Sequence, residues 1–155
     1  MSSTQTSNER ATQIPTAATV ETKLEVVVLP VSDVERAKRF YMSLGWRLDA
    51  DFTTGDDWRA VQLTPPGSPC SVIFGKGFTA AVPGSLQGTF LVVDDVKAAR
   101  AELIGRGVDV SEIRHMTPDG WKPGQDPERR DYNSFADFSD PDGNTWVLQE
   151  SRRYE

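Results

Sequence analysis

The sequence predicts an α+β fold made of two tandem units, each containing a strand, a helix and further strands. One observation is a strand-like run followed by a helix with a capping motif and a terminal glycine. Another is that six residues of this segment recur 62 positions later. In addition, the Pro-Pro-Gly turn at 65–67 recurs as Pro-Asp-Gly at 141–143, an offset of 76. Similarity at a fixed offset indicates a duplicated supersecondary unit.

The first unit opens with the β-branched run at 24–31, which is typical of a buried strand. Ser32 and Glu35 form a Ser-x-x-Glu capping box that predicts the start of a helix, and Gly45 predicts its end. Apolar residues recur at helical spacing between them: Val34, Ala37, Tyr41 and Leu44, with Phe40 alongside. Two further strands are expected at 59–63 and 70–74, on either side of the 65–67 turn.

The second unit repeats the strand, the helix cap, the helix face and the terminal glycine. The six repeated residues are Leu91, Val93, Asp95, Val96, Ala99 and Gly107. The two offsets differ by 14 residues, which indicates an insertion in the second unit, expected as a loop over about 109–133. Long loops rich in proline are functional or disordered, and this one can fold over a cavity mouth as a lid.

Composition limits the class of protein. The 155 residues fit a single domain over 22–152, with module one at 22–83 and module two at 86–152, preceded by a polar tail at 1–21 that we expect to be disordered. A net charge of -6 argues against a nucleic-acid partner, and no apolar run is long enough for a membrane span. The single cysteine, Cys70, excludes an internal disulfide. We therefore expect a cytoplasmic protein.

Two motifs resemble those of a known family. Leu29-Pro-Val-Ser-Asp-Val-x-Arg-Ala-x-x-Phe-Tyr, followed by Leu-Gly-Trp at 44–46, resembles the opening of a glyoxalase/bleomycin resistance/extradiol dioxygenase domain. Asp140-Pro-Asp-Gly-Asn-x-Trp-Val-Leu-Gln-Glu resembles the closing hairpin of the same vicinal oxygen chelate superfamily. The resemblance covers residues 23–151. It implies two βαβββ modules that form an open, curled mixed β-sheet around a central cavity.

The resemblance fails at the metal ligands. The metalloenzymes of the family hold a divalent ion on four strand residues, and the matching positions here are Val26, Gly88, Val147 and either Ser71 or Ile73. These side chains lack the imidazole and carboxylate donors that such ions require. The chain is therefore identified as a divergent member without the metal ligands, and we expect neither a metal nor another cofactor.

Several side chains are candidates for binding a ligand in the cavity. Strand alternation points Gln149, and by the same argument Gln62, toward the cavity, although both could instead face solvent. The insertion supplies the remaining candidates: Trp121, Arg129, Arg130 and Tyr132. The two arginines could clamp a carboxylate or phosphate, or could pair with Asp126, Glu128 or Asp131.

The only histidine, His115, is a weak catalytic candidate. It could act as a general base near neutral pH, or it could be an exposed residue of the loop without a role in chemistry.

Two functions are compatible with these residues. One is a binding protein like the bleomycin-resistance branch, which takes a small organic molecule without metal and acts as a homodimer whose chains together build the ligand grooves. The alternative is a glyoxalase-type lyase or isomerase, or a dioxygenase, with a divergent or dimer-built site. Metal analysis and ligand-induced tryptophan quenching would separate the two.

Overall fold

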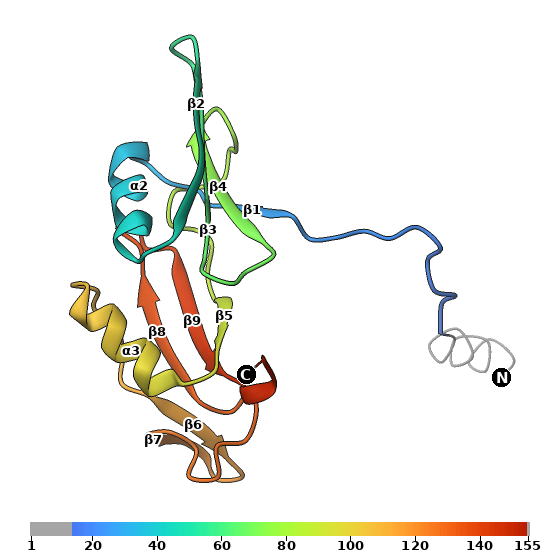
Figure 1. The fold of residues 1–155 in the computed structure, drawn as a ribbon, viewed down its shortest axis with the longest axis vertical. Helices are drawn as coiled ribbons and strands as arrows, with labels where there is room; N and C mark the ends of the chain where they lie inside the picture. Colours follow the sequence, from blue (N-terminus) through green and yellow to red (C-terminus); the bar gives the residue numbers. More distant parts are fainter. Residues whose placement is uncertain (1–13, 155) are drawn as a thin grey trace, which may run out of the picture.

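The computed structural model describes residues 14–154, which form two β-sheets with one helix packed on each (Figure 1). The first module consists of β1 (Val26–Val28), α2 (Val34–Ser43), β2 (Arg47–Thr54), β3 (Trp58–Thr64) and β4 (Ser71–Lys76). The second consists of β5 (Thr89–Val93), α3 (Val96–Gly105), β6 (Arg114–Thr117), β7 (Gly120–Pro123), β8 (Phe135–Ser139) and β9 (Thr145–Glu150). A short 3-10 helix, η1 (Arg152–Tyr154), follows.

The two sheets have equivalent strand orders, except that the second has one additional edge strand, β7. The first sheet is β1-β4-β3-β2 and the second is β5-β9-β8-β6-β7. In each module the first and last strands pair in parallel, and the remaining pairs are antiparallel. This topology confirms the α+β fold and the tandem βαβββ modules. Within residues 14–154 the sheets remain separate, so the strands do not close into a barrel.

The insertion differs from the loop that the sequence suggested. Residues 114–123 form the hairpin β6–β7, which joins the edge of the second sheet through β8. The turn at 118–119 brings Met116 opposite Trp121, and such cross-strand pairs stabilise a hairpin. Irregular structure is confined to the ends of the insertion.

Most of the expected disordered tail, residues 1–13, lies outside the described residues, while 14–21 is exposed and has neither helix nor strand.

The repeated acidic residues cap both helices. Asp33 accepts a hydrogen bond from the Arg36 amide, and Asp95 accepts one from the Ala98 amide, both at 3.0 Å. The capping residue of α2 is therefore Asp33 and not Ser32. The Ser32 hydroxyl instead binds Asp142 in the other module, at 2.5 Å. Beyond α2, Gly45 takes the left-handed φ of 85° that a helix terminus of this kind requires.

One hydrophobic core joins the modules on the side of the sheets where the helices pack. Tyr41 and Trp46 of the first module contact Trp146 of the second, with ring centroids 6.1 and 5.3 Å apart. Phe74 and Phe138 extend this aromatic cluster on either side. All five are buried. The modules are thus held together through their helix-covered sides.

Four buried side chains form what we call the junction network: Tyr41, Asp140, Asn144 and Trp146. The Tyr41 hydroxyl donates to Asp140 at 2.8 Å and accepts from the Trp146 indole N–H at 3.0 Å. Burial, aided by the Asp140 charge, raises the pKa of Tyr41 well above its usual range, so the hydroxyl stays protonated and can donate.

Asn144 completes the junction network by binding the chain on both sides of the module boundary. Its side-chain N–H groups donate to the Pro30 carbonyl at 2.9 Å and to Asp140 at 2.8 Å. Its side-chain oxygen accepts from the Leu86 amide at 3.0 Å. The Asp-Pro-Asp-Gly-Asn motif therefore has a structural role, since it fixes one module against the other.

Replacing Tyr41 with phenylalanine should destabilise the fold. The change leaves Asp140 and the Trp146 N–H each without one hydrogen bond in a buried site, which costs about 1–3 kcal/mol of the free energy of unfolding. Chemical denaturation measures this loss. Tyr132→Phe makes the same chemical change at a more exposed tyrosine and should cost less than about 0.5 kcal/mol. Equal losses for the two variants would show that the junction network is not what stabilises the fold.

Candidate functional site

Each sheet has one side that no helix covers. The helix α2 packs on β3 and β4, and α3 packs on β8 and β9. Both helices lie to the left of the sheets in Figure 1. We call the opposite sides the open faces. Residues paired in register point to the same side of a sheet, so the strand registers identify the side chains on each open face.

The open face of the first sheet carries an aromatic group. Phe52 on β2 and Trp58 on β3 pack edge to face, with ring centroids 5.9 Å apart, and Trp58 stacks on Phe78 at 5.4 Å. Phe52 is 59% exposed. Gln62 and Ile73 lie opposite each other in register on this face, nearer its centre. Most of this surface is therefore apolar and open to solvent.

The open face of the second sheet carries a mixed aromatic and charged group. Phe90, Val147 and Asp137 are in register across β5, β9 and β8. Further along, Trp121 lies opposite Met116 in the β6–β7 hairpin. Phe90 and Trp121 are 53% and 51% exposed. This face thus presents large rings to solvent, as the first one does.

Arg114 organises the part of this face near the hairpin. Its guanidinium group forms a two-bond ion pair with Asp137, at 2.6 and 3.2 Å. The same group lies 5.0 Å from the Trp121 ring centroid and 5.8 Å from that of Phe135. The two rings pack edge to face at 5.4 Å. The result is a rigid, half-buried polar pair beside an exposed indole, suited to a flat molecule that carries a hydrogen-bonding group.

The predicted ligand-binding residues are divided between the two sheets. Trp121 and Gln149 lie on the open face of the second sheet, and Gln149 donates to the Tyr132 carbonyl at 3.1 Å. Gln62 lies on the open face of the first sheet. The expected central cavity is not enclosed by one chain over these faces, because Phe52, Phe90 and Trp121 all remain more than half exposed.

Arg129 and Arg130 form ion pairs within the chain. Arg129 binds the buried Glu150 at 2.9 Å, a partner that the sequence did not suggest. Arg130 binds Asp126 at 3.2 Å and also pairs with Glu128, as the alternative interpretation held. The Arg129 pair fastens the segment at 124–134 to β9, whereas the Arg130 pairs lie within the segment. A ligand clamp made of the two guanidinium groups would have to break these pairs.

His115 lies on β6 and not in an exposed loop. It is 8% exposed, and its Nδ1 is 2.7 Å from the Gly124 carbonyl oxygen. Because it alternates with Arg114 and Met116, it points away from the open face of the second sheet. The burial of His115 results from the hairpin that the sequence did not predict. In this position it does not face the rings of Trp121 and Phe135.

The positions of the family's metal ligands do not fit a metal ion. Val26 lies opposite Ser71 in register, Ile73 lies two residues further along β4, and Val147 lies opposite Phe90. The Ser71 hydroxyl is 2.6 Å from that of Thr64. Aliphatic and hydroxyl side chains of this kind, together with Gly88, offer neither imidazole nor carboxylate. Across residues 14–154 no three His, Cys, Asp or Glu side chains are grouped so as to hold an ion.

Sequence reasoning missed Arg114, Asp137, Phe52 and Phe90. Phe135 and Asp137 are two residues apart in a strand-like run, and this spacing indicates that both side chains lie on the same side of the second sheet. It could not reveal their neighbours, because the hairpin that supplies Arg114 was expected to be a loop. The exposed aromatic residues of β2 and β3 gave no signal that distinguishes a ligand surface from a core.

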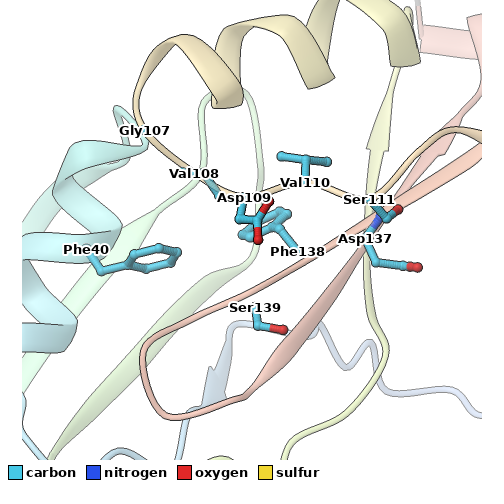
Figure 2. A pocket seen from close by; sticks show the side chains of 9 residues that line it. All are labelled: Phe40, Gly107, Val108, Asp109, Val110, Ser111, Asp137, Phe138 and Ser139. Carbon is cyan, nitrogen blue, oxygen red and sulfur yellow. The ribbon is translucent and has the colours of Figure 1, made fainter.

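A separate hollow of about 420 Å³ lies between α2 and the segment that follows α3. Figure 2 shows Phe40, Val108, Asp109, Phe138 and Ser139 around it. None of the predicted site residues lines this hollow.

The tandem modules, each a mixed sheet covered by a helix on one side, define a class of two-module α+β proteins. The sequence profile of the Glyoxalase/Bleomycin resistance protein/Dioxygenase superfamily matches residues 23–148. The chain belongs to this superfamily. No helix in residues 14–154 has the length and apolar character needed to cross a membrane.

Solved structures of the same superfamily share the fold. TnmS3, an antibiotic binding protein from Streptomyces sp. CB03234, is 35% identical over 86% of this chain and 98% of its own, with a TM-score of 0.66. A glyoxalase/bleomycin resistance protein from the same organism is 36% identical over 83% of this chain and 100% of its own, with a TM-score of 0.63.

A more distant relative is a superfamily member from Sphaerobacter thermophilus DSM 20745. It is 29% identical over 84% of this chain and 98% of its own, with a TM-score of 0.65. A comparison with curated proteins gave no match.

The buried carboxylate of Asp126 should make stability depend on pH in acid. A hydrogen bond from the Asn133 side chain, then backbone N–H groups and the Arg130 charge, lower the pKa of Asp126 to about 2. Its value in the unfolded chain is about 3.9. Ionised Asp126 therefore stabilises the fold above about pH 4, and this contribution is lost as the pH falls toward 2.

Asp126→Asn removes this titration. The stability difference between the original chain and the variant, measured by denaturation at several pH values, should shrink from pH 4 to pH 2. Asp119→Asn, at the exposed turn of the hairpin, is the control and should keep the original pH dependence. A difference that stays constant with pH would contradict the role given to Asp126.

Proposed function

We propose that this protein binds a small, flat organic molecule on its open faces, without a metal ion, in a cavity completed by a second copy of the chain. The observation that carries the proposal is the Arg114–Asp137 ion pair beside the exposed ring of Trp121. Similarity to a relative described as an antibiotic binding protein supports the same class of function.

The exposed rings support a binding surface. Phe52 and Trp58 on one face, and Phe90 and Trp121 on the other, are each at least 37% exposed. Clustered apolar surface of this kind marks sites for ligands or partners. A ligand pocket combines such surface with a few fixed polar groups, which the Arg114–Asp137 pair provides.

A second copy of the chain would cover the open faces, which a single chain leaves exposed to solvent. The faces of a single chain leave the rings in solvent, whereas ligand pockets cover most of a ligand's surface. The strand β1 is at the edge of the first sheet, so one side of it is available for contact with another chain. An open face of one chain placed against that of its partner would bury the rings and leave a groove between them.

Enzyme activity has less support. A general base must come within hydrogen-bond reach of the group from which it takes a proton. His115 is buried on the opposite side of the second sheet from Trp121, with one ring nitrogen against the Gly124 carbonyl. Binding is therefore the function that the geometry of the open faces favours.

The metal content tests the metal-free part of the proposal. The protein, purified without chelators, should contain far less than one equivalent of Zn, Ni, Mn or Fe per chain by elemental mass spectrometry, since the four family positions lack suitable donors. Prolonged treatment with EDTA should leave ligand binding unchanged. One tightly held metal ion per chain, or binding abolished by EDTA, would overturn this part.

Replacing Trp121 with alanine should weaken ligand binding. The probe is 2-naphthol, a flat two-ring molecule whose hydroxyl can bond to the Arg114–Asp137 pair, with affinity measured by isothermal titration calorimetry. Loss of one stacking ring should raise the dissociation constant about threefold to tenfold. Trp121→Phe should restore part of the affinity, because it restores a ring.

Met42→Ala is the matched control, since it removes an exposed side chain on α2 away from the open faces. It should bind 2-naphthol as the original chain does. The proposal fails if the original chain does not bind 2-naphthol at millimolar concentration, or if the Trp121→Ala chain binds it equally well.

A further inference from the structure

A second hollow lies between the modules, along the free edge of β5. Its volume is about 580 Å³. One wall is the turn that joins β3 to β4, the second is β5, and the third is α3. Its apolar lining includes Leu44, Trp46, Pro66, Leu103, Phe138 and Leu148. This volume is in the range of small-molecule sites.

This hollow, which we call the junction cleft, is separate from the proposed aromatic site. Leu148 and Phe138 point to the helix-covered side of the second sheet, whereas Trp121 and Asp137 lie on its open face. Of the open-face residues, Phe90 and Val92 on the edge strand reach the rim of the junction cleft. A molecule bound in the cleft would therefore contact the core beneath α3 and not the ring of Trp121.

The mouth of the junction cleft is acidic. An adjoining hollow of about 540 Å³ shares Pro66, Ala99 and Glu102 with the cleft, and continues to Asp94 and Asp95. Asp95 uses one carboxylate oxygen to cap α3. Arg106 approaches Glu102 only to 3.8 Å, and the Glu102 side chain is 69% exposed. Three carboxylates thus line the mouth of the cleft and the adjoining hollow. Two guanidinium groups also lie there: that of Arg106, near Glu102, and that of Arg129, 3.2 Å from the Asp94 carbonyl oxygen.

We propose that the junction cleft binds a small hydrophobic cation, such as an aryl-alkyl ammonium ion. The apolar part of the molecule would enter between Trp46 and Leu103, where it leaves water. The ammonium group would stay at the mouth, near Glu102 and Asp94. The three carboxylates outnumber the two guanidinium groups there, so the mouth favours a cation over an anion of the same shape.

The test compares three probes of similar size: 2-phenylethylammonium, neutral 2-phenylethanol and anionic 3-phenylpropionate. Titrations are followed by the backbone NMR signals of the intact chain. The ammonium ion should bind most tightly and the anion most weakly, and the largest shifts should occur at 66–68, Ala99 and Leu103. Added salt should reduce the preference for the cation, because the mouth is solvent-exposed.

Glu102→Gln should weaken binding of the ammonium ion about threefold to fivefold, as expected for one partly exposed ion pair, and leave the alcohol unaffected. Asp119→Asn removes the same charge at the hairpin turn and should change neither. Ala99→Leu narrows the cleft and should weaken all three probes. The proposal is overturned if the three probes bind equally, if the shifts map to Trp121 and its neighbours, or if Glu102→Gln has no effect.

Discussion

The hydrogen bond between the Tyr41 hydroxyl and Asp140 is the interaction on which the arrangement of the molecule depends. It connects the helix of the first module to the last turn of the second, in a site that water does not reach. A buried polar group stabilises a fold only when all its partners are present. Asn144 and the Trp146 indole supply those partners, and the aromatic core packs around them. The relative position of the modules is therefore fixed by directional bonds as well as by apolar contact.

This arrangement determines where function can lie. Because the helix-covered sides meet in the shared core, the open faces are left without cover from the same chain, and their rings remain in solvent. Such exposure costs free energy unless a ligand or a partner covers the rings. The same packing creates the junction cleft, since the turn at 65–69 and α3 approach β5 from different modules. Both proposed sites are thus consequences of how two similar units are joined.

Much of the fold could be predicted because its signals are local. The spacing of Val34, Ala37 and Tyr41 indicates one face of a helix, and the repeated aspartates mark where both helices begin. The site was harder to predict, because it depends on contacts between distant segments. The ion pair of Arg129 joins a loop to β9, and the Arg114–Asp137 pair requires a hairpin of two four-residue strands. Trp121 was identified as a ligand-binding candidate, but its neighbours could be known only from the sheet register.

The molar mass of the chain in solution, measured by light scattering, tests whether two chains build the site. If a second copy completes the cavity over the open faces, the protein should have twice the 17.1 kDa mass of one chain. Phe90→Glu, which places a charge on an open face, should reduce the mass to that of a single folded chain. A mass of 17.1 kDa for the original chain at all concentrations, with or without 2-naphthol, would contradict the claim that two chains build the site.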